Sequence, residues 1–284
     1  MTIDLAPIRA QLGRTVTEHD EATAMPLRLM AVTFDRDEPD PVPGSAVPPG
    51  WHWLFFPAAT KRSALGADGL PLKGAVLPEM PLPRRMYAGG KLTFSDAIRV
   101  GDALRRETEF SDVQLREGAT GTLIIATQTR RIFTPRGLAV TETMTSVFRE
   151  AVPEGQQGGI PKREEPPAGL PWRRTITTDP VTLFRYSALT FNPHRIHYDR
   201  PYAMGTEGYP GLVVHGPFSQ QCLIDLLRDH AGGRAILEFD MRARAPLFDT
   251  APFQVVGRPV AGGAELWAVT PAGTIAMQAT ARLG

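Results

Sequence analysis

The sequence predicts an α+β fold in which a curved antiparallel sheet wraps a central helix, and three observations support a strand-rich chain of two packed units. The 284 residues exceed what one hydrophobic core usually serves, so two packed units are expected. Gly and Pro, 27 of each, argue against a helical bundle and for many turns between short elements. Each half of the chain also contains a set of three or four β-rich segments separated by turn residues.

In the first half, segments rich in β-branched and aromatic residues predict the strands 91–94, 104–113, 121–133 and 137–148. Before them lie Trp51, Trp53, Phe55 and Phe56, with a spacing of mostly two residues. These aromatic residues fit either a pocket lining or plain core packing, and core packing is the more common of the two.

The clearest change of composition runs from residue 153 to residue 171, where Pro, Gly and charged residues leave little to bury. We interpret this segment as a linker. It divides the chain into an N-terminal unit, residues 1–152, and a C-terminal unit, residues 172–284.

The second half contains the two helices that the sequence predicts most clearly. Asp179 and Pro180 form an N-cap and first helical position for a helix over 180–189. Gly216-Pro217 opens a second helix that runs to Arg228 with a continuous apolar face. The strands predicted after it are 235–239, 253–257, 264–270 and 274–282, and this order suggests one central helix wrapped by a curved sheet.

Two short segments of similar sequence occur, at residues 100–103 and 247–250. Each follows a short predicted strand that ends in an aromatic residue and precedes a long one. They indicate a weak internal duplication. The common rhythm of antiparallel sheets would also produce such a pattern, and the strands alone do not separate the two readings.

Charge and composition exclude several classes of function. Hydrophobic residues make up 42% and charged residues 21%, and the net charge of +1 provides no field for a nucleic acid. With Cys222 as the single cysteine and no glycine-rich dinucleotide loop, we expect no disulfide, no metal and no cofactor. No signal-like run occurs in residues 1–20 and no apolar stretch of about 20 residues occurs anywhere, so we expect a cytoplasmic protein without membrane contact.

Polar groups are most densely packed in residues 185–199, which include His194 and His197. His215 follows directly before the Gly216-Pro217 helix start, where a free backbone N–H is expected. Taken singly, each feature has an ordinary structural explanation as a turn or a cap. Together they supply what acid/base chemistry beside an oxyanion needs.

These residues resemble the MaoC-like or (R)-specific enoyl-thioester hydratases and dehydratases. The family signature is D-x-N-P-[LIV]-H-x-D, followed by His-Gly at the head of a helix. Ile196-His197-Tyr198-Asp199 matches the end of the signature, and His215-Gly216 follows at the expected distance. Asn192 stands where the family has its catalytic Asp, and His194 where it has Asn. Residues 186–199 and 84–90 resemble one branch, which contains the type 2 3-hydroxyacyl-thioester dehydratases and the mesaconyl-C4-CoA and itaconyl-CoA hydratases.

The resemblance implies a double hot-dog fold with two central helices, each wrapped by a curved antiparallel sheet, in which the second unit is catalytic and the first shapes the acyl pocket. It implies that His197 acts as general base and acid and that the Gly216 amide donates to the thioester oxygen. Asn192 cannot take a proton, so we expect it to hold water and the acyl group. His215 is expected to brace this turn at the substrate.

The implied activity is a hydro-lyase reaction at the double bond of an α,β-unsaturated acyl-CoA, with CoA as part of the substrate. A short dicarboxylic acyl group, as in mesaconyl-C4-CoA or itaconyl-CoA, needs an Arg for its free carboxylate, and Arg84, Arg85 and Arg185 are the candidates. The alternatives are a 3-hydroxyacyl-ACP or -CoA dehydratase of fatty-acid metabolism, a thioesterase, and a non-catalytic acyl-thioester-binding protein. We also expect a homodimer, because exposed sheet edges are often covered by a partner.

Overall fold

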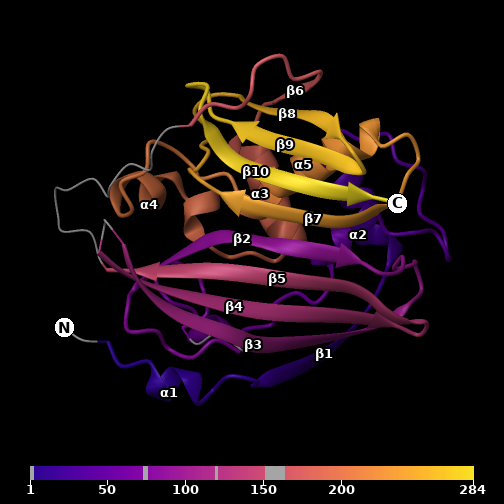
Figure 1. The fold of residues 1–284 in the computed structure, drawn as a ribbon. Helices are drawn as coiled ribbons and strands as arrows, with labels where there is room; N and C mark the ends of the chain where they lie inside the picture. Colours follow the sequence, from indigo (N-terminus) through magenta and orange to yellow (C-terminus); the bar gives the residue numbers. More distant parts are fainter. Residues whose placement is uncertain (1–2, 73–75, 119–120, 151–163) are drawn as a thin grey trace.

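The computed structural model describes residues 3–72, 76–118, 121–150 and 164–284. In these residues ten strands form one antiparallel sheet that runs across the whole molecule (Figure 1). The strands of the first half are β1 (Thr15–Glu21), β2 (Arg84–Phe94), β3 (Ala103–Gly118), β4 (Gly121–Thr134) and β5 (Gly137–Arg149). Those of the second half are β6 (Trp172–Ile176), β7 (Ile236–Ala243), β8 (Phe253–Val260), β9 (Gly263–Val269) and β10 (Ile275–Leu283).

The strand order is β1-β3-β4-β5-β2-β7-β10-β9-β8-β6, so the two halves meet where β2 pairs with β7. Read outward from this central pair, both halves have the same order. In each half the strands run outward in the order second, fifth, fourth, third and first along the chain. The shared topology supports the internal duplication that the repeated phrases indicated.

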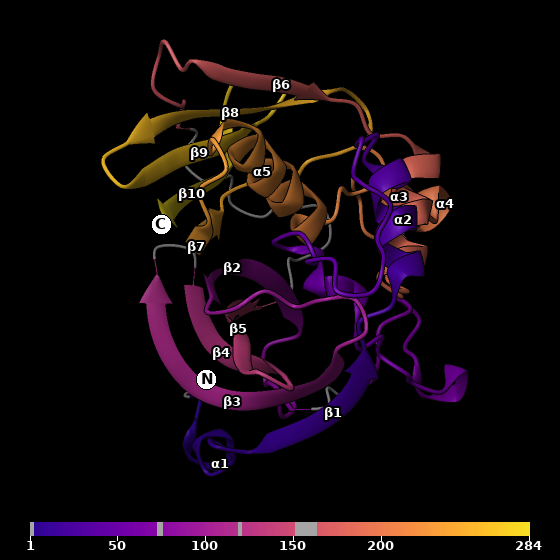
Figure 2. The same cartoon turned by 90° about the vertical axis from the view of Figure 1, so that its right-hand side faces the viewer.

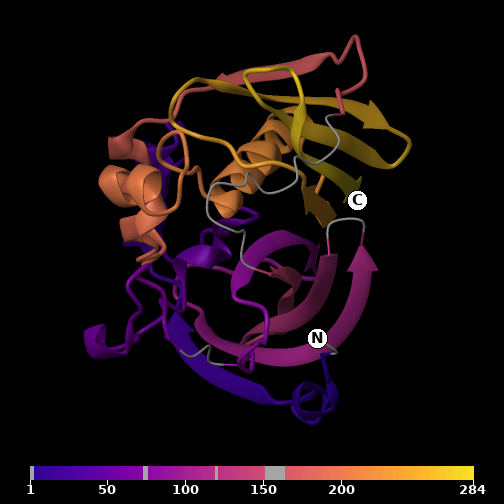
Figure 3. The same ribbon diagram turned by 90° about the vertical axis from the view of Figure 1, so that its left-hand side faces the viewer.

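The helices of the described chain are α1 (Ala6–Arg9), α2 (Ala24–Thr33), α3 (Pro180–Leu189), α4 (Arg200–Gly205) and α5 (Gly216–His230), with 3-10 turns η1 (Trp51–Leu54), η2 (Arg62–Ala64) and η3 (Arg195–His197). Helices α2 and α3 pack together, whereas α1 lies apart from the other helices, next to β3 (Figure 2). Figures 2 and 3 show the second-half strands curving around α5. All residues from Phe218 to Leu227 of α5 are buried, as expected for a helix enclosed by a sheet.

The first half differs from the prediction of a second central helix. Its longest helix, α2, has ten residues and packs against α3 instead of being enclosed by β2–β5. The concave face of this sheet is instead covered by Leu5, Ile8 and the loop residues Val76, Leu77 and Leu82, which pack on Phe110 and Ile124. The run 51–56 forms η1 and a turn, and Trp51, Phe55 and Phe56 are buried in the core.

The predicted linker 153–171 lies mostly outside the described residues, which resume at residue 164. From there the chain lies against the second half. The carbonyl of Glu164 accepts a hydrogen bond from the Ile275 amide at 2.7 Å, and Leu170 packs on the cluster that contains Trp267. The division into 1–152 and 172–284 stays a prediction.

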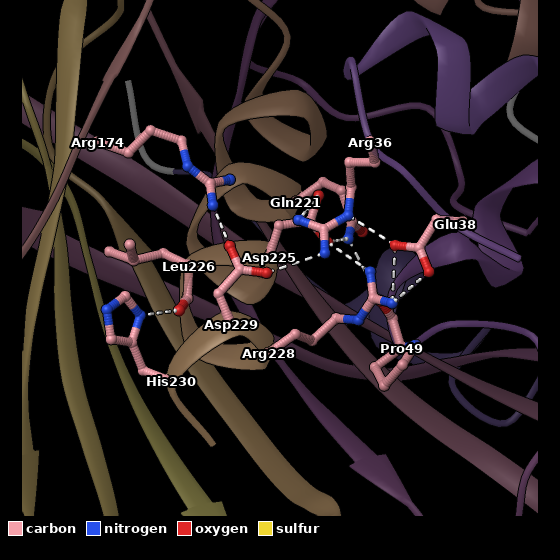
Figure 4. Close-up of polar contacts among 10 residues, drawn as sticks. All are labelled: Arg36, Glu38, Pro49, Arg174, Gln221, Asp225, Leu226, Arg228, Asp229 and His230. Carbon is pink, nitrogen blue, oxygen red and sulfur yellow. Dashed lines mark hydrogen bonds and ion pairs between the residues drawn. The ribbon is translucent and has the colours of Figure 1, made fainter. Parts of the chain in front are cut away.

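A cluster of alternating charges joins the two halves at the C-terminal end of α5 (Figure 4). Arg36, from the segment after α2, contacts Glu38 at 2.6 Å, Asp229 at 2.9 Å and Asp225 at 3.9 Å. Arg228 bonds Asp225 and Glu38, and Arg174 of β6 bonds Asp229. Three arginines therefore match three carboxylates across the joint.

Burial and charge oppose each other at the carboxylates of this joint. Burial works to raise the pKa of Glu38, but the hydrogen bond from Arg36 and the charge of Arg228 bring it below its ordinary value of 4.5. Asp225, which has a 2% exposed side chain, is the opposite case, because its burial outweighs Arg36 and Arg228 and raises its pKa. The arginines thus keep Glu38 charged and partly offset the cost of burying Asp225.

Candidate active site

His197 lies in η3, buried between α3 and α4, and its ring orientation is set by one hydrogen bond. Its Nδ1 lies 2.7 Å from the carbonyl oxygen of Val213, so Nδ1–H donates and Nε2 is left without its proton. Burial, only partly offset by the Val213 bond, lowers the pKa of His197 to about 4. The ring is therefore neutral at pH 7, with an acceptor at Nε2.

His215 lies directly behind His197. The two rings stack at 3.7 Å between centroids, and His215 Nε2 lies 2.8 Å from Ser187 Oγ. Tyr186 closes the other face of the His215 ring with an edge contact at 4.8 Å. Burial and the neighbouring histidines keep the pKa of His215 well below its ordinary value, so it is a neutral support for His197. With 1% exposure it braces the site from behind.

The N-terminus of α5 lies next to these histidines in sequence and in space. His215 is the N-cap residue and Gly216 and Pro217 begin the first turn, where Pro217 has no N–H and the Gly216 amide has no partner within the helix. Tyr87 of β2 packs on this turn: a Cβ at Gly216 would lie 3.1 Å from its ring, and its hydroxyl donates to Gln220 Oε1 at 3.2 Å. A side chain at position 216 would require the Tyr87 ring to shift by a few tenths of an ångström, so Gly216 permits this close contact between the halves.

Asn192 has a local role in the structure. Its side-chain Oδ1 accepts a hydrogen bond from the backbone amide of His194 at 3.1 Å. Its backbone amide donates to the Ser187 carbonyl at 2.8 Å. Asn192 therefore shapes the turn that presents His194. The ring of His194 in turn lies edge-on to His197, with centroids 5.5 Å apart.

The loop from Asn192 to Asp199 is tied to the first half. The guanidinium of Arg195 pairs with Asp199 at 2.7 Å and donates to the Ala67 carbonyl at 2.9 Å. The Arg195 amide donates to the Asp68 carbonyl, and Gly69 lies so close to Pro193 that a Cβ there would clash with its carbonyl. The first half thus holds the loop that carries His197.

Phe191 occupies the left-handed position that ends α3, with φ of 49°. The amide of Asn192 bonds the Ser187 carbonyl and the amide of Phe191 bonds that of Ala188, the pattern of a helix end that favours glycine. The Phe191 ring is 56% exposed. Phe191→Gly is therefore expected to stabilise the protein by about 1 kcal/mol, or a rise in Tm of roughly 2 °C.

Thermal unfolding followed by circular dichroism checks this, with Ala188→Gly inside α3 as a control that should lower Tm. A lower Tm for Phe191→Gly would show that ring contacts outweigh the backbone strain. A higher Tm combined with weaker substrate binding would show that the exposed ring serves the site.

The strand register places three arginines on the concave face of the first-half sheet. Arg106 and Arg130 face the interior from β3 and β4, and Arg85 faces it from β2. Glu18 pairs with Arg106 at 2.6 Å and Glu142 pairs with Arg130 at 3.2 Å. Among the described residues Arg85 has no carboxylate partner.

Arg85 lies on the same face of β2 as Tyr87, which packs on Gly216. Its Nε donates to Ser146 Oγ at 3.2 Å, and Ser146 is the cross-strand partner of Tyr87. Two residues along a strand span about 7 Å, so Arg85 lies about that far from Tyr87. The surrounding protein and the charge of Arg130 lower the pKa of Arg85, although its side chain is accessible. A bound anion would relieve both effects.

The other predicted arginines lie elsewhere. The backbone of Arg84 pairs with Arg149, and its side chain is outside the described part of the chain. Arg185 is exposed on α3, away from the hydrogen-bonded set around His197. Sequence reasoning did not identify Tyr87, Ser187 or Val213, because each acts through a contact between segments distant in sequence. Tyr87 lies within the first-half phrase 84–90, which was the available signal.

No group of His, Cys, Asp and Glu in the described chain is arranged to hold a metal ion. None of its helices is long and apolar enough to cross a membrane. The chemistry available is a neutral imidazole with a free Nε2, beside amides at a helix N-terminus. This combination removes and returns a proton while a negative oxygen is stabilised.

Known proteins with a similar sequence identify the family of this chain. A family model described as hydroxyacyl-thioester dehydratase type 2 matches residues 50–249. The chain is 40% identical over 275 residues to the mesaconyl-C(4)-CoA hydratase of Chloroflexus aurantiacus, with 97% of each chain covered.

Solved structures show the same fold. A MaoC-like dehydratase from Phytophthora capsici superposes with a TM-score of 0.68 at 15% identity, covering 99% of both chains. A Mycobacterium tuberculosis protein described as having a double hotdog fold superposes with a TM-score of 0.58 at 12% identity, covering 96% of both. The double hot-dog fold is thereby confirmed. The chain belongs to the hydroxyacyl-thioester dehydratase type 2 family.

Proposed function

We propose that this protein is a hydro-lyase that adds water reversibly to the double bond of a short dicarboxylic enoyl-CoA, of the mesaconyl-C4-CoA or itaconyl-CoA kind. The observation that carries the proposal is His197, whose Nδ1 is held by Val213 and whose Nε2 is free beside the N-terminus of α5. The name of the 40% identical relative supports the substrate class.

In the proposed reaction the thioester oxygen accepts a hydrogen bond from the Gly216 amide, where the helix N-terminus favours the developing negative charge. Nε2 of His197 takes a proton from water as the water oxygen bonds to Cβ. The electrons of the double bond move to the thioester oxygen as an enolate. Nε2 then returns the proton to Cα, so that atoms and charge balance and no cofactor takes part.

Arg85 supports a dicarboxylic acyl group over an alkyl one. It is the one cation on the described concave face without a carboxylate partner, and it lies two positions along β2 from Tyr87, which packs on Gly216. A guanidinium with free Nη groups binds a carboxylate through two parallel hydrogen bonds. We therefore assign the free carboxylate of the acyl group to Arg85.

The test measures initial rates on mesaconyl-C4-CoA, itaconyl-CoA and crotonyl-CoA by loss of the enoyl absorbance. We expect a dicarboxylic substrate to exceed crotonyl-CoA in kcat/KM, and Arg85→Gln to remove roughly 100-fold of that preference. Arg185→Gln, exposed on α3, is the matched control and should change nothing.

Three outcomes would contradict parts of this proposal. Faster wild-type turnover of crotonyl-CoA would favour a 3-hydroxyacyl-ACP or -CoA dehydratase of fatty-acid metabolism. Release of free thiol would indicate a thioesterase. Binding of all three thioesters without turnover would indicate a non-catalytic acyl-thioester-binding protein.

We propose a cytoplasmic homodimer as the working form. Exposed apolar side chains on the adjacent helices α2 and α3 support a second copy as partner; they are Met25, Leu29, Val32, Val181 and Phe184. The reduced Cys222 fits the cytoplasm. A monomer mass in sedimentation equilibrium at micromolar concentration would contradict the dimer.

A further inference from the structure

His194 is a second imidazole at the site that the mechanism above does not use. Its ring lies nearly perpendicular to that of His197, at 87°, with centroids 5.5 Å apart. It is half-buried, whereas His215, whose ring stacks on His197, is buried. His194 is thus the histidine on the accessible side of His197.

No described residue forms a hydrogen bond with a ring nitrogen of His194. The hydrogen bond between this residue and Asn192 is made by the His194 backbone amide. The carboxylates that act on the ring are Asp68 from the first half and Glu207 after α4, and the neighbouring ring is that of His197. Burial outweighs the two carboxylates and lowers the pKa of His194, so one ring nitrogen is a free acceptor at neutral pH.

Asn192 and His194 together show an exchange of chemical roles. Relative to the signature D-x-N-P-[LIV]-H, an amide replaces the carboxylate five residues before His197, and an imidazole replaces the amide three residues before it. The amide at 192 cannot accept a proton, and its oxygen holds the backbone of His194. Hence the acceptor missing at position 192 is present at position 194.

We propose that His194 is a catalytic residue that accepts a hydrogen bond from the attacking water, while His197 takes that water's other hydrogen as a proton. The hydrogen held by His194 stays on the oxygen and becomes the product hydroxyl, and the proton on His197 passes to Cα. In the reverse direction His194 holds the hydroxyl as it leaves. This assignment rests on the proposed hydration.

The test compares wild type, His194→Asn and the double variant Asn192→Asp/His194→Asn on the preferred enoyl-CoA across a range of pH. His194→Asn is expected to lower kcat about 10- to 100-fold with KM changed less than about threefold. The acid side of its kcat profile should become shallower, because one of two protonations that stop the reaction has been removed. The double variant, which restores a carboxylate at 192, should regain most of the lost kcat.

His230→Asn is the matched control, since this histidine stacks on Trp172 at the other end of α5 and should leave kcat unchanged. Wild-type kcat in His194→Asn, or a double variant no faster than the single one, would overturn the assignment while the hydration stands. A wild-type protein that hydrates no enoyl-CoA would instead overturn the proposed function and this assignment together.

Discussion

Replacing His197 by asparagine is expected to lower kcat roughly 10³-fold while the protein stays folded. The asparagine Nδ2 occupies the place of His197 Nδ1, so it keeps the hydrogen bond to the Val213 carbonyl. The change removes Nε2, the atom that takes and returns the proton. Steady-state rates on the preferred enoyl-CoA, together with Tm, separate loss of chemistry from loss of structure.

The pH dependence gives a second measurement on the wild type. Because burial lowers the pKa of His197 to about 4, the ring stays neutral well below the ordinary value of 6.5. The acid decline of kcat/KM should therefore be centred near pH 4. A decline centred near 6.5, or a His197→Asn variant with kcat close to wild type, would show that another group moves the proton.

Replacing Arg36 by methionine is expected to destabilise the protein by about 3 kcal/mol. Methionine keeps much of the volume but removes the charge that three carboxylates share, those of Glu38, Asp225 and Asp229. Asp225 is buried and depends on Arg36 and Arg228 for compensation. Removing one partner of a buried ion pair leaves the other charge uncompensated, which costs more than the pair itself contributes.

The midpoint of urea denaturation measures this effect, with Arg28→Met as the matched control. Arg28 pairs with Asp40 at 2.6 Å, but both side chains are exposed, so the midpoint of Arg28→Met should stay close to that of wild type. A loss for Arg36→Met as small as that of the control would show that the cluster in Figure 4 does not hold the halves together.

The lowered pKa of Glu38 determines how the destabilisation by Arg36→Met changes with pH. Its pKa is below 4.5 in the folded protein, so its share of stability is complete above pH 4.5 and is lost as the pH falls through the lowered folded value. The difference between Arg36→Met and wild type should accordingly shrink under acid conditions. A difference that does not change down to pH 3 would contradict the ionic origin of the effect.

The long elements could be predicted because their own sequences carry the signal. Helices α3 and α5 and the strands β3, β4, β5 and β8 to β10 follow the predicted segments, with ends displaced by a few residues. Strands β1 and β6 were not predicted, since Thr-Val-Thr-Glu-His-Asp-Glu and Trp-Arg-Arg-Thr-Ile are polar edge strands that each pair on one side. Helix α2 was missed for a related reason: Pro26 lies in its first turn and several of its apolar residues are exposed, so it has no clear amphipathic pattern.

The second central helix was predicted wrongly for a physical reason. Topology is duplicated between the halves, but the interior of the first sheet is filled by side chains of its N-terminal segment and loop. Any apolar segment of suitable volume can cover a concave sheet, because the hydrophobic effect does not require a helix. A repeated strand pattern therefore does not predict what fills the sheet.

His197, Asn192 and Gly216 could be singled out from the sequence because they lie in one short stretch that resembles a family signature, and their catalytic roles stay predictions. The tertiary structure alone decided which nitrogen of His197 is free, through the carbonyl of Val213 sixteen residues away. It also distinguished Arg85 from Arg185, since the surroundings of a charged group decide whether it can bind an anion. Sheet pairing brings Arg85 next to Ser146, which is 61 residues away in the sequence. Residue type and spacing determine what a group can do, whereas burial and long-range pairing determine whether its proton or charge is available to do it.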